Sequence, residues 1–404
     1  MSRSTPVYNP PDPNAPGKPH VPDWFPPPAT KADLDFAKLR TIDLSIMDSG
    51  DETAIKELVA MTKQAILEDG FLFIERYGVS LEQLHRQFSL AQYCLYNISE
   101  EDQQRLLFNP DVSGKWAGYK HPWGFKREKK VYDGITQFNW YSEQWNDCDK
   151  IPKVILPFMD EIVAFNEFLE QSVNRRILAL FSKVLELPDD YLWDNVQSHE
   201  GSPTGEGYYR HALFKPFSQE AEKLSKGLRF HGHCDYGTTT LLFSVPVTQL
   251  QIWGNDEQWR YVPYKPGSIV INIGETLEIV SGGHFKATRH RVFKPPADQH
   301  DFERLSIVQF NSSIGDLRMG PCMDSPLIQR EGFPDYQGAF REFQKARANG
   351  LSVPTNAEWR EIQIAQTTNT TDVSRNVLGQ DWIMHEGKLM NKREFHGVTV
   401  ILPV

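Results

Sequence analysis

The stretch Arg229-Phe-His-Gly-His-Cys-Asp-Tyr-Gly-Thr238 decides how the rest of the chain is interpreted. In a strand, residues i and i+2 point to the same face, so we expect His233 and Asp235 to face inward together while Cys234 faces away. One imidazole and one carboxylate are a mixed nitrogen and oxygen pair suited to a divalent transition metal. The pair alone is a weak signal, because 12 histidines and 53 acidic residues give roughly 1.6 such matches by chance.

A third candidate ligand, His290, lies 55 residues after Asp235. That interval is long enough for further strands to return the chain beside the first pair. Two histidines and one carboxylate on one face of an octahedron leave three positions open, as in non-heme Fe(II) oxygenases. Zinc more often takes a closed tetrahedral set, or three protein ligands and water. His231 is an alternative ligand on the face of His233, but the residue two positions after it is not acidic.

The sequence Arg304-Leu305-Ser306 places a guanidinium and a hydroxyl on one face of a further strand. Arginine offers a bidentate fork for a carboxylate, and serine adds one more donor. The pair therefore fits the distal carboxylate of a small diacid. A surface ion pair is the alternative interpretation of Arg304.

Short β-rich runs separated by turn residues surround these motifs, which is the pattern of a sandwich or barrel. The expected strands are 239–243, 250–253, 259–262, 268–273, 288–293 and 305–311. Before them, helical periodicity marks a helix that ends at Gly70, a helix opened by a capping box at Ser80 and Gln83, and a long helix over 162–184. Ten of the 27 prolines lie in residues 1–30, which predicts an extended arm that Trp24 and Phe25 could pin to the body.

The 404 residues carry a formal net charge of −10, which argues against nucleic acid or an anionic membrane as the main partner. No stretch approaches 18 apolar residues, so we expect no membrane span. The four cysteines are far apart, which fits a reduced, cytoplasmic chain rather than a disulfide framework. An aromatic run over residues 116–141 includes Tyr119 and Phe125, which either line a substrate mouth or pack over the rim of the barrel.

The ordered set of His233-x-Asp235, the segment Asn272–Val292 that contains His290, and Arg304-x-Ser306 resembles the isopenicillin N synthase-like family of Fe(II)/2-oxoglutarate-dependent dioxygenases. The resemblance covers about residues 39–312. It implies a double-stranded β-helix, or jelly-roll, core flanked by helices. It also implies Fe(II), 2-oxoglutarate and O2 as cofactors and co-substrates, with His233, Asp235 and His290 as the metal ligands.

By the same resemblance, Arg304 and Ser306 would hold the C5 carboxylate of 2-oxoglutarate. Tyr209 falls where many members place a further tyrosine that contacts 2-oxoglutarate, although Gly207 replaces the usual asparagine here. Phe310 falls where members often place an aromatic side chain that faces the substrate. We therefore expect cofactor contacts from Arg304, Ser306 and Tyr209, and substrate contacts from Phe310, Tyr119 and Phe125.

These features predict a proline-rich arm over 1–38, a mostly helical region over 39–190, a jelly-roll core over 191–315 and a C-terminal extension over 316–404 that covers the active site. The expected function is oxidation of a C–H bond of a small molecule, in specialised metabolism, by a monomer or weak homo-oligomer. Two alternatives stay open: an oxidase like isopenicillin N synthase that uses no 2-oxoglutarate, and a non-catalytic small-molecule binder.

Overall fold

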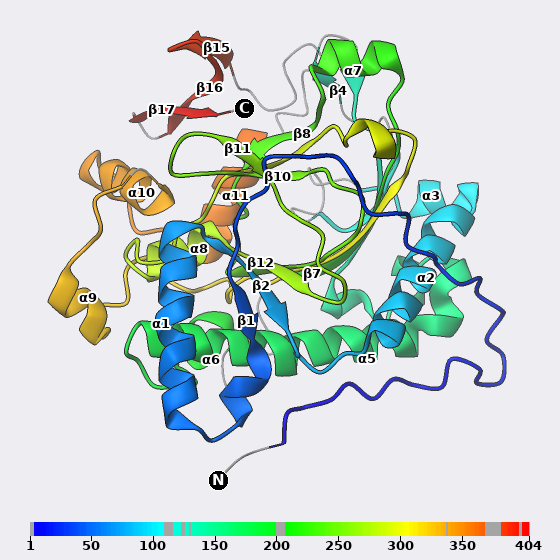
Figure 1. Cartoon of the computed structure of the whole chain (residues 1–404), viewed down its shortest axis with the longest axis horizontal. Coiled ribbons are helices and arrows are strands. Elements are labelled where there is room, and N and C mark those ends of the chain that lie inside the picture. The colour runs from blue at the N-terminus through cyan, green and yellow to red at the C-terminus, as the bar shows by residue number, and fades with distance from the viewer. Residues whose placement is uncertain are drawn as a thin grey trace.

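The structure is a computed structural model of the whole chain. It describes residues 4–108, 116–122, 126–128, 131–198, 207–336, 338–367, 381–395 and 398–403. Figure 1 shows β-sheets in the middle of the molecule, a row of helices beneath them, and a separate C-terminal sheet above them. None of the helices within the described ranges is long and apolar enough to cross a membrane.

The larger sheet of the barrel has eight strands in the order β1-β2-β12-β9-β14-β7-β6-β3. Neighbouring strands are antiparallel, except for the parallel pair β1 and β2. The strands are β1 (Thr41–Asp43), β2 (Phe71–Glu75), β3 (Gly118–Lys120), β6 (Ile135–Trp140), β7 (Tyr208–Phe214), β9 (Thr239–Phe243), β12 (Ile269–Ile273) and β14 (Arg304–Phe310).

A second, four-stranded antiparallel sheet faces the first, in the order β11-β10-β13-β8. Its strands are β8 (Leu228–His233), β10 (Leu250–Trp253), β11 (Trp259–Tyr261) and β13 (His290–Phe293). The two sheets form the predicted jelly roll, and five of the six strands expected beyond residue 238 are found within one residue at each end. The exception is β13, which begins at His290 rather than at Thr288.

Alternation along the strands divides the apolar side chains between two cores. On the inner face, Leu242 and Val270 pack with Phe71 and Phe73 between the two sheets. Their neighbours on the outer face belong to a larger core shared with the helices. By the same alternation, successive residues of each strand in the larger sheet face the barrel interior and the helical layer in turn.

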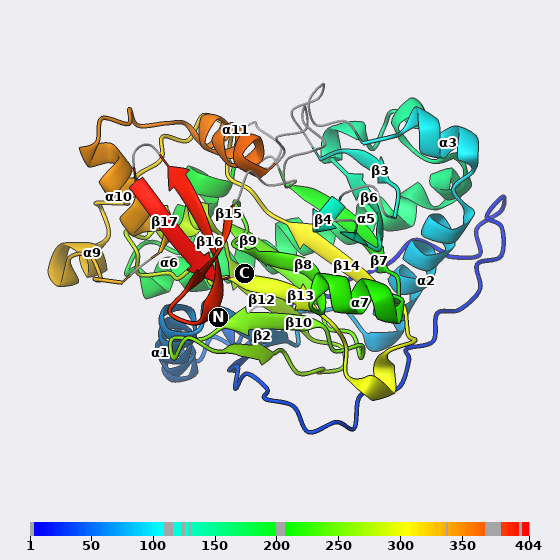
Figure 2. The same ribbon diagram turned by 90° about the horizontal axis from the view of Figure 1, so that it is seen from above.

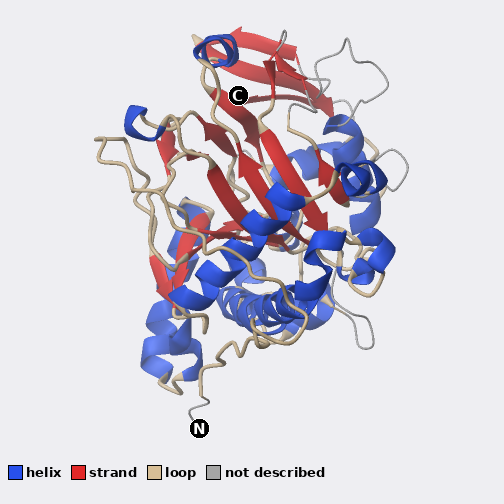
Figure 3. Cartoon of the chain, turned by 90° about the vertical axis from the view of Figure 1, so that its right-hand side faces the viewer, coloured by secondary structure: helices blue, strands red, loops and turns tan. Residues whose placement is uncertain are grey.

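Helices cover the outer face of the larger sheet, as Figure 3 shows. The helix expected over 162–184 is one continuous run in which α5 (Met159–Phe168) and α6 (Arg175–Val184) flank a π-helical turn, Leu169–Asn174. The predicted capping box is confirmed at the start of α2 (Leu81–Asn97), where both reciprocal bonds between Ser80 and Gln83 are present. The remaining helices are α1 (Glu52–Glu68), α3 (Glu100–Arg105), α7 (Gln219–Ser225), α8 (Glu275–Val280), α9 (Pro326–Glu331), α10 (Ala339–Ala348) and α11 (Asn356–Thr367).

The N-terminal arm lies along the body of the protein. Trp24 is buried, stacks on Phe88 of α2 with ring centroids 4.4 Å apart, and donates its backbone N–H to Ser89 Oγ. Phe25, in contrast, is 80% exposed. Trp24, and not Phe25, therefore anchors the arm to α2. The mostly helical region after the arm also supplies four strands, β1, β2, β3 and β6, to the larger sheet.

The C-terminal part adds a three-stranded sheet, β15 (Asp381–His385), β16 (Lys388–Phe395) and β17 (Val398–Pro403). A small hairpin of β4 (Lys126–Glu128) and β5 (Val131–Tyr132) lies elsewhere. In Figure 2 the C-terminal sheet lies beside the barrel, and the contact is direct because Arg289 Nε donates to the carbonyl of Pro403 at 2.6 Å.

A buried carboxyl group connects the barrel to the C-terminal helices. Glu278 of α8 is fully buried and accepts N–H groups from Ala287 at 2.8 Å and from Phe340, at the start of α10, at 2.9 Å. Burial raises the pKa of Glu278 from its ordinary 4.5 to about 7.

We predict that this carboxyl lowers the stability of the protein as the pH rises from about 4.5 to 7. The folded state binds more protons than the unfolded state in that window, so the free energy of unfolding falls by up to about 3 kcal/mol. Urea denaturation at pH 5 and pH 7.5 measures the difference. Glu278→Gln should remove this difference in unfolding free energy between the two pH values, whereas Glu57→Gln, at an exposed position of α1, should leave it unchanged. Equal pH slopes in the Glu278→Gln variant and the wild type would contradict the assignment.

Candidate metal centre

Three side chains that are distant in sequence converge at one end of the barrel. His233, Asp235 and His290 each offer one ligand atom, and these atoms all lie within 4.8 Å of one another. Asp235 Oδ1 is 3.7 Å from His233 Nε2 and 3.8 Å from His290 Nε2. These separations suit three ligands of one ion.

The second sheet positions the two histidines. Strand β8 ends at His233 and β13 begins at His290, and the antiparallel register places these two residues directly opposite each other. The sequence spacing predicted that Asp235 shares a strand with His233, but the strand ends at His233. Asp235 lies in the turn beyond β8, where its carbonyl accepts the N–H of Glu275. The turn, not strand alternation, brings the carboxylate to the histidines.

Backbone carbonyls orient both imidazole rings. His233 Nδ1 lies 3.1 Å from the carbonyl of His231, and His290 Nδ1 lies 3.2 Å from the carbonyl of Thr288. With Nδ1–H donating to a carbonyl, the lone pair of Nε2 is available to a metal, which is the usual second layer of a histidine metal site.

Two polar side chains on the inner face of the larger sheet hold the carboxylate. Asp235 Oδ2 accepts from Thr240 Oγ1 at 2.6 Å and from Asn272 Nδ2 at 2.8 Å. Thr240 and Asn272 are cross-strand partners on β9 and β12. They occupy one carboxylate oxygen and leave Oδ1 turned to the histidines.

The charge states of the site match a cation. Burial, together with the neighbouring His290, lowers the pKa of His233 to about 3, so this imidazole is neutral. Burial tends to raise the pKa of Asp235, but the positive charge that His290 or His233 carries when protonated, together with the bonds from Thr240 and Asn272, outweighs it and lowers the pKa overall. A neutral imidazole and an ionised carboxylate are forms that ligate Fe(II).

We predict that Asn272→Ala lowers the Fe(II) affinity by about 10- to 100-fold, the usual cost of losing a group that orients a ligand. Competition with a chromophoric chelator measures the affinity. Asn195→Ala on the surface of the helical layer should leave it unchanged. An unchanged affinity in Asn272→Ala would mean that Thr240 alone orients the carboxylate.

Arg304 and Ser306 lie on the inner face of β14, as predicted. Both are buried, and Arg304 Nη1 donates to Ser306 Oγ at 2.6 Å. The guanidinium packs over the ring of Phe214 at 5.3 Å, its Nε has no hydrogen-bond partner, and no ion pair to it is found among the described residues. Burial lowers the pKa of Arg304 to about 10. A buried cation in this state has room for a carboxylate partner.

Two of the residues predicted to contact 2-oxoglutarate or the substrate, Tyr209 and Tyr119, do not lie on the inner face with Arg304. The register pairs Tyr209 with Gln309 of β14 and with Trp140 of β6, whereas Arg304 pairs with Phe214. Paired residues on neighbouring strands face the same side, and Gln309 faces the opposite side from Arg304 because the two are an odd number of residues apart. Tyr209, the partner of Gln309, therefore faces the helices, where its ring contacts that of Phe165.

Tyr119 is likewise buried in the core on the helical side, opposite Phe138, and does not reach the barrel interior. Phe125 lies outside the described residues. Phe310 does face the interior, because it pairs with Thr240 of β9.

The sequence argument missed four inner-face residues near the ligands: Thr240, Asn272, Tyr208 and Arg210. Asn272 was recognisable as the one polar residue of an otherwise apolar, buried strand, and Thr240 as one of two threonines at the start of the buried strand β9. Tyr208 and Arg210 could not be separated from Tyr209 and His211 without the register of β7 against β14.

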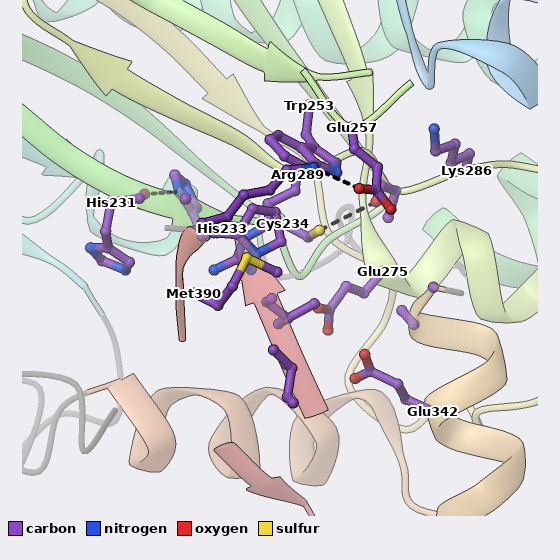
Figure 4. A pocket seen from close by; sticks show the side chains of 18 of the residues that line it. His231, His233, Cys234, Trp253, Glu257, Glu275, Lys286, Arg289, Glu342 and Met390 are labelled. Carbon is purple, nitrogen blue, oxygen red and sulfur yellow. Dashed lines mark hydrogen bonds and ion pairs between the residues drawn. The ribbon is translucent and has the colours of Figure 1, made fainter. Parts of the chain in front are cut away.

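A cavity of about 370 Å³ lies between the end of β8 and the C-terminal part of the chain (Figure 4). His231, His233 and Cys234 line it from the barrel, and Glu342 and Met390 line it from the C-terminal segments. The Cys234 thiol donates to the carbonyl of Ala287 at 3.2 Å, and the His231 ring lies 6.0 Å from that of His233. Neither is part of the three-ligand group. His284 lies in a turn, and its Nε2 is 2.8 Å from the carbonyl oxygen of Gly332.

Residues 208–313 match the model of the 2OG-Fe(II) oxygenase superfamily. A 2-oxoglutarate-dependent dioxygenase of Gibberella zeae, FG08081, is 25% identical over 290 residues, which is 70% of this chain and 82% of the relative. Another, frbH of a Dothideomycetidae species, is 29% identical over 321 residues, which is 78% of this chain and 94% of the relative.

Solved structures share the fold. A full-length Neurospora crassa protein in complex with alpha-KG and 5-formyluracil superposes with a TM-score of 0.63 at 18% identity, over 82% of this chain and 98% of that one. JOX2 in complex with 2OG, Fe and JA gives a TM-score of 0.57 at 20% identity, over 82% and 92%. The solved structures show the shared fold, and the match over residues 208–313, the relatives and the three-ligand site together show that the chain is an Fe(II)- and 2-oxoglutarate-dependent dioxygenase.

Proposed function

We propose that His233 Nε2, Asp235 Oδ1 and His290 Nε2 hold the Fe(II). The observation that carries this assignment is the convergence of the three atoms within 4.8 Å, with the other polar atom of each side chain already bonded to the protein. Three protein ligands on one side leave positions for 2-oxoglutarate and O2.

Arg304 and Ser306 bind the C5 carboxylate of 2-oxoglutarate in this proposal. Ser306 Oγ accepts from Arg304, so its own hydrogen is available to donate to a carboxylate oxygen. The remaining guanidinium N–H groups supply the charge that the carboxylate requires.

Bound iron, with 2-oxoglutarate and O2, supplies the oxidative decarboxylation that yields succinate and CO2 and drives oxidation of a substrate C–H bond. The chain supplies geometry. His231 and Thr288 carbonyls fix the imidazoles, Thr240 and Asn272 fix the carboxylate, and Arg304 fixes the far end of the diacid. The product, whether hydroxylated, desaturated or cyclised, depends on how the inner-face residues place the target carbon.

We further propose a small-molecule substrate of specialised metabolism. Kihadalactone A synthase of Citrus sinensis, 23% identical over 286 residues that cover 65% of this chain and 78% of the relative, supports this placement. The four cysteines are free, which agrees with a reducing, cytoplasmic location. The net charge of −10 is the reason for proposing a monomer or weak homo-oligomer without nucleic-acid or anionic-membrane partners, since both of those partners would be repelled. The C-terminal extension over 316–404 closes one side of the site, since its segments line the cavity beside His233.

Succinate formation tests the proposal. The Fe(II)-loaded protein should convert 2-oxoglutarate to succinate slowly without a substrate and faster with one. The alternative oxidase would consume O2 without succinate, and the non-catalytic binder would do neither. Relatives named 2-oxoglutarate-dependent dioxygenases favour the first outcome over both. A chain that binds Fe(II) but never forms succinate would refute it.

A further inference from the structure

Arg210 is a charged residue on the inner face of the barrel with no assigned role. It lies on β7 opposite Val308 of β14 and Asn139 of β6. Arg304 and Ser306 share this face, because residues 304, 306 and 308 alternate with the outward-facing positions. Arg210 therefore belongs to the same interior surface as the proposed 2-oxoglutarate contacts.

The protein holds this guanidinium in one position. Its Nε donates to Asn139 Oδ1 at 2.8 Å, and its Nη2 donates to the hydroxyl of Tyr208 at 3.1 Å. The guanidinium carbon also lies 4.8 Å from the ring centroid of Phe310 and 5.3 Å from that of Tyr208. Contacts of this kind fix the planar fork and reduce the entropy that a ligand must overcome.

The positive charge of Arg210 is not neutralised within the described part of the chain. Its two bonded partners there, Asn139 and Tyr208, are both neutral, and no ion pair to it is found among those residues. An arginine has five N–H donors. Donors therefore remain for an external oxygen atom.

The cluster borders the metal ligands. Phe310 stacks on Tyr208 with ring centroids 4.7 Å apart and is the cross-strand partner of Thr240, whose hydroxyl bonds to Asp235. Burial chiefly raises the pKa of Tyr208, the charge of Arg210 lowers it, and the charge of Asp235 raises it further. Tyr208, Arg210 and Phe310 are partly exposed, whereas Arg304 and Ser306 are buried. The cluster is thus at the open side of the interior, and Arg304 is deeper.

We propose that Arg210 anchors the substrate by binding an oxygen acceptor on it, either a carboxylate or a ring carbonyl, and so places the substrate beside the metal. This inference rests on the proposed function. It narrows the substrates to small molecules that carry such an acceptor close to the carbon that is oxidised. Tyr208, Asn139 and Phe310 are positioning residues that act through the guanidinium.

Anaerobic calorimetry on the protein loaded with Fe(II) and 2-oxoglutarate tests the proposal with three probes. 3-Phenylpropanoate carries a carboxylate, thymine carries ring carbonyls, and 3-phenylpropan-1-aminium matches the first in size but has no acceptor. We expect at least one acceptor probe to bind the wild type more tightly than the aminium does. Arg210→Met should weaken the binding of that probe by 10-fold or more, and Arg210→Lys should weaken its binding less. Which acceptor probe responds identifies the acceptor as a carboxylate or a carbonyl.

A matched control is Arg291→Met. Arg291 also donates Nε to an amide oxygen, that of Gln251, and packs over two rings, Trp259 and Phe293, but its position next to His290 in β13 turns it away from the interior. It should not alter probe binding.

Three results would overturn the proposal: acceptor probes that bind Arg210→Met as tightly as the wild type, no preference for either acceptor probe over the aminium, or a loss of 2-oxoglutarate binding in Arg210→Met. The last would assign Arg210 to the co-substrate. A wild type that fails to bind Fe(II) or 2-oxoglutarate at all would instead refute the proposed function.

Discussion

Asp235→Ala is expected to abolish turnover, with succinate formation reduced by about 10³-fold or more, because the carboxylate is the only anionic ligand of the proposed site. Its loss leaves two imidazoles to hold a dication. It also leaves Thr240 and Asn272 without the oxygen that they hold at 2.6 and 2.8 Å. Iron content after gel filtration and succinate release measure the two effects together.

His231→Ala is the matched control for Asp235→Ala. His231 is two residues before His233, and its ring is 6.0 Å from that of His233, but it contributes only its backbone carbonyl to the orientation of the neighbouring imidazole. The variant keeps that carbonyl, so it should bind iron and form succinate like the wild type. If His231→Ala lost iron while Asp235→Ala retained it, the ligand set would be wrong.

Local patterns in the sequence predicted the elements of the fold well, because each has a short-range physical cause. The capping box at Ser80 and Gln83 satisfies backbone donors at the start of α2, and Gly70, at φ +62°, follows the end of α1. Alternating or wholly apolar runs marked the strands from β9 to β14. These signals depend on neighbouring residues alone, so they survive without knowledge of the tertiary structure.

The convergence of the three proposed metal ligands was also predictable, but for a reason that was partly wrong. His233 and Asp235 converge although Asp235 lies beyond the strand, in a turn whose backbone bonds to Glu275. The residues that orient the ligands were not found, since a cross-strand partnership such as that of Thr240 and Asn272 depends on register.

Register also explains why the tyrosine was misplaced. In the run Gly207-Tyr-Tyr-Arg-His211, a shift of one residue exchanges Tyr209 for Tyr208 or Arg210 at the inner face. Both choices are chemically reasonable, because no residue on either face of β7 is fully exposed. Only pairing with β14 decides between them, and it turns Tyr209 to Phe165 and the helices.

Arg304→Leu provides the second large effect, and it tests the register at the same time. Leucine removes the charge and the fork that would bind the distal carboxylate of 2-oxoglutarate in a buried environment. Truncation of one partner of such a pair costs about 2–5 kcal/mol, so the KM for 2-oxoglutarate should rise by at least about 30-fold and by up to about 5,000-fold. Arg304→Lys retains the charge without the fork and should fall between leucine and the wild type.

Tyr209→Phe discriminates the inner face from the outer one. Its hydroxyl is buried and has no hydrogen-bond partner among the residues that the structure describes. Because its ring is also directed to the helices, removal of the hydroxyl should leave the KM for 2-oxoglutarate unchanged. Succinate release measured over a range of 2-oxoglutarate concentrations gives both values. A raised KM in Tyr209→Phe with a normal KM in Arg304→Leu would reverse the assignment of the two faces, because the co-substrate can contact only one side of β7 and β14. The expected result, a large rise for Arg304→Leu alone, requires that residues 304 and 306 point to the metal side while residue 209 points away from it.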